Sequence, residues 1–213
     1  MIRTTLALSA LALATAAFTA PKAEAADFSA RIGAHSVNPK SNNGTVAGLP
    51  ARVGDEISYT GGFSWHINDN FSADLWLGLA KFEHEVALVG AGGAFGVGTD
   101  TVATVEHRPV TLGVNYHFGS ETIRPFIGLG YAWVNVSGET GRGALDGVPL
   151  SASNSNGFTY VLGLDINFTD SLFLRVDARN IDFDTDVTVP ALGGNLGTAN
   201  VDPWVYGLSL GFK

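Results

Sequence analysis

The chain has 213 residues, of which 15% are charged, and a formal net charge of −8. It contains no cysteine, which excludes a disulfide framework, a thiol nucleophile and a thiolate metal site. The acidic balance argues against a nucleic-acid partner, and the sequence carries no cofactor fingerprint and no recognised metal-ligand motif.

Residues 1–25 have the pattern of a secretory signal peptide. Arg3 supplies the positive charge, residues 6–17 form an uncharged apolar run, and Ala23 to Ala25 fit a small-x-small cleavage site. The apolar run is shorter than the roughly 20 residues that a transmembrane helix needs. We therefore expect an exported chain whose mature domain spans residues 26–213. Removal of Arg3, Lys22 and Glu24 leaves 10 basic and 19 acidic residues, a formal charge of −9.

Segments of the mature domain alternate in polarity with a period of two, which places successive side chains on opposite faces of a strand. In segment 158–168, Phe158, Tyr160 and Leu162 share one face, whereas Asp165 and Asn167 share the other. Apolar outside and polar inside is typical of a barrel in lipid. The sequence predicts an all-β fold, an eight-stranded antiparallel transmembrane β-barrel, with strands at about 28–37, 57–67, 71–81, 105–118, 123–135, 158–168, 172–179 and 203–212.

The connections between these strands alternate in length. Residues 68–70, 119–122 and 169–171 are short turns, whereas residues 38–56, 83–104, 137–156 and 184–200 are long. Short periplasmic turns and long extracellular loops are the rule for such barrels. We therefore expect a barrel in the outer membrane of a Gram-negative bacterium with both termini in the periplasm. Aromatic residues near the strand ends predict two interfacial girdles. The inner girdle is Trp65, Phe71, Phe118, Phe168 and Phe212, and the outer girdle is Tyr59, Tyr131, Trp133, Phe158 and Trp204.

Charged residues recur on the inward face of the predicted barrel. An eight-stranded barrel is just wide enough for side chains to fill it, and an unpaired charge there is costly. We therefore expect ion pairs that plug the lumen, with a charge-selective pore as the alternative. The residues concerned are Arg31, Asp74, Arg124, Asp165, Arg175, Asp177 and Arg179.

Two of the predicted external loops are unusually apolar. Residues 86–98 carry no charge, and residues 187–196 are similar. A contiguous apolar patch on a surface often marks a binding site. The pattern favours two interpretations equally. One is a funnel for an apolar ligand lined by Leu88, Val89, Phe95 and Leu192, and the other is loops that pack on each other or on lipid.

Proline is normally excluded from central strands because it cannot donate a ladder hydrogen bond. Pro109 lies towards the outer end of its predicted strand. One hypothesis is that it opens a lateral window near the funnel. The alternative is a strand that begins just after Pro109 and needs no gap.

Two small clusters of titratable residues flank the second long loop. Glu83, His84 and Glu85 follow one strand, and Glu106 and His107 begin the next, so we expect them to be neighbours across one hairpin. An enzyme would need a clustered acid–base or nucleophile set at this rim. We favour a solvated polar rim as the interpretation of these residues, and we expect the chain not to be an enzyme.

Four short motifs, spread in order over the mature domain, resemble the outer membrane protein W (OmpW) family. They are Ser36-Val37-Asn38-Pro39-Lys40-Ser41, His107-Arg108-Pro109-Val110-Thr111-Leu112, Arg124-Pro125-Phe126-Ile127-Gly128-Leu129-Gly130 and Val201-Asp202-Pro203-Trp204-Val205. The chain departs from such barrels at its end, where Lys213 follows the aromatic residue that the barrel-insertion machinery reads.

The resemblance implies a small barrel in outer-membrane lipid that helps small hydrophobic molecules, such as alkanes, across the membrane. The route implied enters an apolar external funnel and leaves sideways through the wall. The alternative is a structural or surface-receptor barrel that acts through its extracellular loops without transport.

Overall fold

The computed structural model describes residues 28–90 and 99–213. The predicted signal peptide and residues 91–98 of the predicted apolar loop lie outside these ranges. No helix in the described ranges is long and apolar enough to cross a bilayer.

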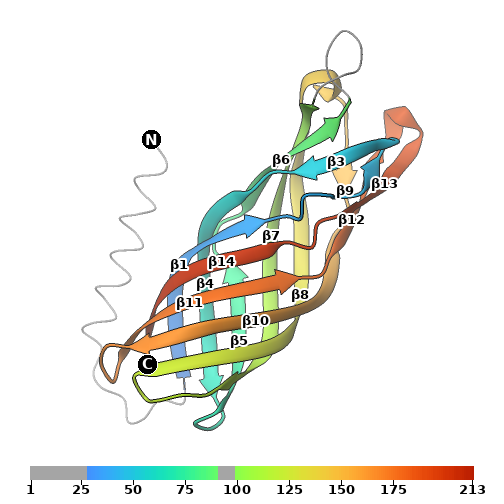
Figure 1. Ribbon diagram of the computed structural model, residues 1–213. Helices are drawn as coiled ribbons and strands as arrows, with labels where there is room; N and C mark the ends of the chain where they lie inside the picture. The colour runs from blue at the N-terminus through green and yellow to red at the C-terminus, as the bar shows by residue number, and fades with distance from the viewer. Residues whose placement is uncertain (1–27, 91–98) are drawn as a thin grey trace, which may run out of the picture.

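Strands at eight positions close into an antiparallel barrel (Figure 1). The closure is made by β14, which pairs with β11 on one side and with β1 on the other. The predicted fold class is therefore confirmed. Around the barrel the strands are β1 (Phe28–Asn38), β4 (Glu56–His66), β5 (Phe71–Gly78), β7 (Thr99–His117), β8 (Ile123–Gly141), β10 (Ser155–Asn167), β11 (Leu172–Ile181) and β14 (Trp204–Phe212).

The barrel continues beyond the length that a membrane requires. β7 and β8 have 19 residues each, whereas a spanning strand needs about 9–11. β6 (Phe82–Val89) pairs with the outer half of β7, and β3 (Leu49–Val53) pairs with β6. β9 (Ser151–Ala152), β12 (Asp184–Val189) and β13 (Gly194–Asn200) form a separate sheet at the same end, with β2 (Thr45–Val46) paired to β3.

The long external connections predicted at this end are present, but they also contain strands that the sequence analysis did not predict. The physical reason is that these segments also alternate. In β6, His84 and Leu88 are buried, whereas Glu83 and Glu85 are exposed. A strand with one buried face needs a second wall to bury it, and here the facing segments provide that wall.

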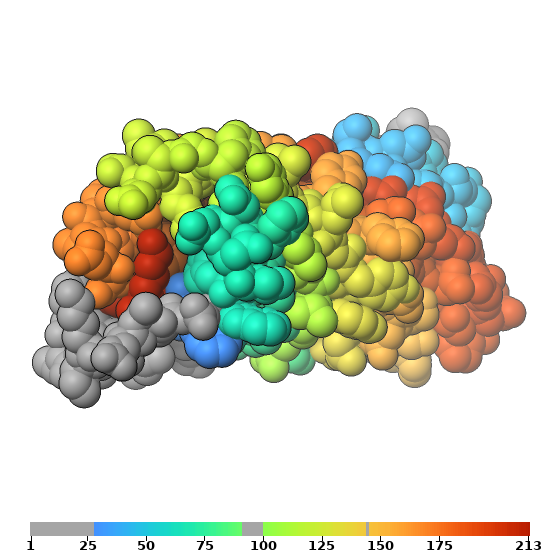
Figure 2. All heavy atoms as spheres, turned by 90° about the horizontal axis from the view of Figure 1, so that it is seen from below, coloured from blue at the N-terminus to red at the C-terminus, as the bar shows by residue number. Residues whose placement is uncertain are grey.

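The outward face of the barrel is apolar, as expected in lipid. Leu129 is 74% exposed and Phe158 is 72% exposed, which would be costly in water. Aromatic rings from neighbouring strands contact one another near both ends, for example Phe71 with Tyr116 and Tyr131 with Phe158. Figure 2 shows the segment around residues 168–171, in orange, at one end of the elongated molecule and the β12–β13 hairpin, in orange-red, at the other.

Glycines on the inward face make room for large polar side chains. A Cβ atom at Gly62 would lie 2.3 Å from the Cζ atom of Arg31. A Cβ atom at Gly207 would lie 2.0 Å from the ring of His35. These glycines are therefore part of the packing of the barrel interior.

A network of ion pairs fills the middle of the lumen. Arg31 binds the Asp74 carboxylate through two nitrogens at 2.8 and 2.7 Å. Arg175 binds Asp165 at 2.6 and 2.7 Å and also reaches Asp74 at 3.2 Å. All four side chains are buried, so their charges are satisfied mainly by one another.

A second group of charges lies in the same interior. Arg179 pairs with Asp177 at 3.1 Å, and His35 contacts the other oxygen of Asp177 at 3.2 Å. Arg124 departs from the expected pattern, because it donates to the backbone carbonyl of Asp69 at 2.5 Å and forms no ion pair within the described residues. It lies at the periplasmic end, where its long side chain reaches a turn instead of Asp165 on the neighbouring strand.

We predict that Arg175→Met lowers the free energy of unfolding by about 3–5 kcal/mol, because breaking a buried ion pair leaves an uncompensated charge. The matched control is Arg124→Met, which removes a bond to a carbonyl at the barrel end and should cost less than about 1 kcal/mol. Urea unfolding of the barrel in lipid vesicles measures both. Equal unfolding midpoints for the two variants would show that the network does not stabilise the barrel.

Candidate functional site

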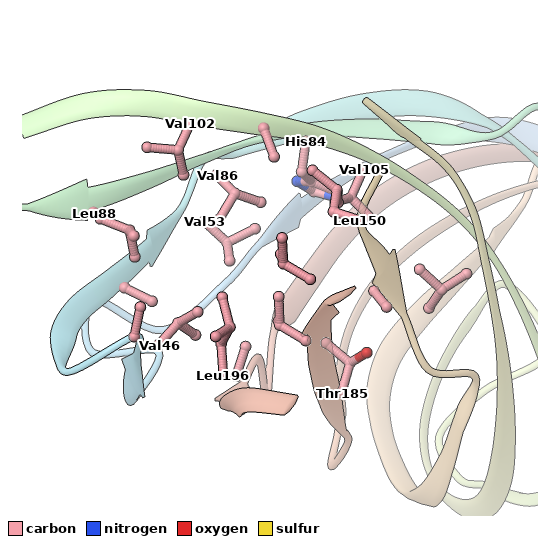
Figure 3. A pocket seen from close by; sticks show the side chains of 18 of the residues that line it. Val46, Val53, His84, Val86, Leu88, Val102, Val105, Leu150, Thr185 and Leu196 are labelled. Carbon is pink, nitrogen blue, oxygen red and sulfur yellow. The ribbon is translucent and has the colours of Figure 1, made fainter. Parts of the chain in front are cut away.

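An apolar cavity lies at the external end, enclosed by the strand extensions (Figure 3). Its volume is 200 Å³. For scale, a dry apolar cavity of about 150 Å³ in another protein holds benzene. Among the residues that the structure describes, every one that lines the cavity is apolar except His84, His107 and Thr185. The chemistry of this wall suits a small apolar molecule.

The walls of the cavity come from segments far apart in the chain. Val46 and Val53 belong to the β2–β3 region, Val86 to β6, and Val187 and Leu196 to the β12–β13 hairpin. Figure 3 shows the side chains of Val53, Val86 and Leu196 directed towards a common space. Only their alternation in sequence could have marked them as lining residues, because nothing local indicates which distant strand they face.

Two of the four expected funnel residues line this cavity. Leu88 and Leu192 are among its walls, the first buried and the second 56% exposed. Val89 is not among the lining residues, because it follows Leu88 on the strand and points to the opposite face. Phe95 lies outside the described residues.

The cavity adjoins a layer of packed apolar side chains, which we call its floor. Trp76, Phe82 and Val205 in this layer are fully buried, and they belong to one cluster with Phe183 and Val201, which line the cavity. Directly beneath, the guanidinium of Arg179 lies over the Trp76 ring at 4.2 Å. The apolar cavity thus ends where the ion-paired core of the barrel begins.

Two histidine rings stand in the wall of the cavity. His84 and His107 stack with ring centroids 4.9 Å apart, and His107 stacks in turn on Phe82 at 5.3 Å. The expected neighbourhood across the hairpin is therefore present. Burial lowers the pKa of His84, which favours the neutral ring, against a smaller opposing effect of the Gly54 carbonyl.

The nearby carboxylates do not join these histidines. Glu83 and Glu106 are cross-strand partners, one residue along from the histidines and so on the opposite face. Glu106 pairs there with Lys81 at 2.5 Å. Within the described residues no group of three or more possible metal ligands is assembled. Two imidazoles thus stand in the cavity wall, and no carboxylate within the described residues is hydrogen-bonded to either of them.

A break in the barrel wall faces Pro109. Leu77 of β5 pairs with Val110, and Phe82 of β6 pairs with His107. Residues 78–81, which connect β5 to β6, therefore bulge opposite Arg108 and Pro109. The ladder of hydrogen bonds that β7 forms with β5 and β6 is interrupted at this point. On its other side Pro109 stays in register with Val134 of β8. The alternative of a strand that begins after Pro109 is wrong, since β7 begins at Thr99.

Comparisons with known proteins agree with this architecture. The model of the OmpW family matches residues 24–213. Outer membrane protein W of Escherichia coli (strain K12) is 27% identical over 201 residues, covering 89% of each chain.

Solved structures share the fold. The outer membrane protein OprG from Pseudomonas aeruginosa aligns with a TM-score of 0.73 at 23% identity, covering 87% of this chain and 94% of that one. The outer membrane protein AlkL, solved in lipid bilayers, aligns with a TM-score of 0.59 at 21% identity, covering 91% and 94%. The chain belongs to the OmpW family of outer-membrane β-barrels.

Proposed function

We propose that this barrel is a passive route for small hydrophobic molecules across the outer membrane. The observation that carries the proposal is the apolar cavity at the external end, whose wall has only three polar members among the described residues. An apolar molecule leaving water for such a wall gains roughly 25 cal/mol for each Å² that it buries. The cavity would thus collect apolar molecules from the external medium.

The core beneath the cavity disfavours onward movement along the barrel axis. Trp76, Phe126 and Arg175 are large, fully buried side chains, and the guanidinium of Arg175 lies over the Phe126 ring at 4.3 Å. A molecule moving straight through would have to separate Arg175 from two carboxylates, which is expensive in a low dielectric. A lateral route avoids this cost.

The interrupted ladder at Pro109 supports a lateral exit into the membrane. It adjoins the floor of the cavity, since Phe82 belongs to that floor and also begins the strand beyond the break. A Cβ atom on Gly78 would lie 3.4 Å from both Phe82 and Pro109, so these groups are close together. We propose that a molecule in the cavity leaves past Phe82 and Pro109 into the bilayer.

The first test is the uptake of a labelled medium-chain alkane by cells with and without this chain, in which insertion is checked by heat-dependent gel mobility. We expect faster uptake with the chain. Leu192→Asp should lower the gain by about threefold or more, because a carboxylate in the wall opposes entry of an apolar molecule. Its control is Ala191→Asp, the exposed neighbour outside the cavity wall, which should leave uptake unchanged.

If the inserted barrel gives no faster uptake than an unrelated eight-stranded barrel, the proposal that it transports hydrophobic molecules is wrong. The structural or surface-receptor role of the external strands would then be favoured. Equal losses in the two aspartate variants would show that the cavity wall is not the entry site.

The lateral exit is tested by Pro109→Ala in the same assay. The alanine restores a backbone N–H at the break, so we expect uptake to fall by about half or more as the wall closes. Pro125→Ala is the matched control, because Pro125 lies on β8 in regular register with Leu164 and away from the cavity. Unchanged uptake in Pro109→Ala at equal expression would contradict the lateral window.

A further inference from the structure

One aromatic ring lies between the apolar cavity and the break in the barrel wall. Phe82 is fully buried and begins β6, directly after the interruption of the ladder with β7. Its ring stacks on His107 at a centroid distance of 5.3 Å, and His107 lines the cavity. Phe82 itself is not among the described residues that line the cavity. Its ring therefore lies behind the cavity wall, on the side of the break.

The residues at the break have little bulk of their own. A Cβ atom on Gly78 would lie 3.4 Å from the Phe82 ring and 3.4 Å from the Cδ atom of Pro109. Because Gly78 has no side chain, the Phe82 ring occupies the space beside Pro109. The Leu79 side chain lies over Gly61 of β4, on the side of β5 that faces away from β7. The Phe82 ring is thus the group that closes the inner side of the break.

The bulge at residues 78–81 is held on one side only. Towards β4 it donates two N–H groups to the carbonyl of Tyr59, at 2.9 and 3.3 Å. Towards β7 no backbone pair joins the bulge to its neighbour in the described part of the chain, and Pro109 has no N–H to donate. A change in the rotamer of Phe82 would therefore open the wall here without breaking a ladder hydrogen bond.

We propose that Phe82 is the gate of the lateral exit and that it limits passage to slender, unbranched apolar molecules. The inference rests on the proposed function, because it assigns a shape of substrate to the same route. Protein interiors are close-packed, so the opening is only as wide as the ring that leaves it. An extended methylene chain fits the space that a benzene ring vacates, whereas a quaternary carbon with its methyl groups does not.

The test compares octane with its branched isomer isooctane, which has the same atoms but a greater width. Uptake of each labelled isomer is measured in cells with this chain, and the uptake of cells with an unrelated eight-stranded barrel is subtracted. We expect octane to enter about tenfold faster, because a pocket that contacts an apolar molecule closely discriminates to about this degree.

Binding to the cavity is measured separately, so that selection at the gate is distinguished from selection at the entry. The purified barrel in detergent micelles is titrated with each isomer, and the methyl groups of Val187 and Leu196 are followed by NMR. Concentrations are corrected for partition into protein-free micelles. We expect comparable affinities, because the two isomers bury similar apolar areas.

Phe82→Ala removes the ring and should widen the exit. We expect isooctane to enter about fivefold faster than through the unmodified barrel and the preference for octane to fall to about twofold, with binding to the cavity unchanged. Phe82→Leu leaves a smaller void and should give an intermediate preference. The matched control is Phe173→Ala, the same substitution of a buried ring near the periplasmic turn and away from the cavity, which should keep the full preference.

The outcomes separate the two proposals. If both isomers enter equally fast, if the preference is already present in binding to the cavity, or if Phe82→Ala keeps the full preference, this inference is wrong and the proposed function stands. If neither isomer enters faster than with the unrelated barrel, the proposed function itself is wrong, and this inference with it. Should Phe82→Ala fail to fold, the unmodified barrel and Phe82→Leu decide.

Discussion

The narrow lumen of an eight-stranded barrel is the constraint on which the rest of this structure depends. Such a lumen must be filled by side chains, and the charges that face it must pair because they are removed from water. One network of ion pairs both fills the lumen and neutralises the charges, and it consists of Arg31, Asp74, Arg175 and Asp165. Inward glycines such as Gly62 leave room for these large side chains. The same packing obstructs the axis, so the proposed use of the barrel must depend on its external end and its wall.

The external end follows from a second property of the chain. β7 and β8 continue past the membrane, and the β3–β6 and β12–β13 strands complete the wall above it. Their inward side chains are apolar, whereas those within the membrane segment are charged. The interior thus changes from apolar to ionic at the layer of Trp76 and Phe82. This boundary adjoins the interrupted ladder at Pro109, which brings the proposed entry and the proposed exit close together.

The period-two pattern predicted the barrel and most of its inward charges, because the alternation of inward and outward side chains can be read from the sequence of each strand alone. It failed for Arg124, whose partner depends on how far a flexible side chain reaches at a strand end. It did not identify the strands within the long external connections, since the length of a connection does not reveal what its residues pair with. The cavity wall requires the meeting of distant segments, such as Val53 and Val187, and no local pattern specifies that.

The most direct test of the central claim is to locate an apolar molecule on the inserted barrel. Protonated octane would be added to a deuterated barrel with protonated methyl groups in deuterated lipid, and contacts between the two would be recorded by NMR. We expect contacts with Val187 and Leu196 in the cavity and with Leu79 beside the break at Pro109. Contacts confined to lipid-facing methyl groups such as that of Leu129, with none in the cavity, would contradict the account.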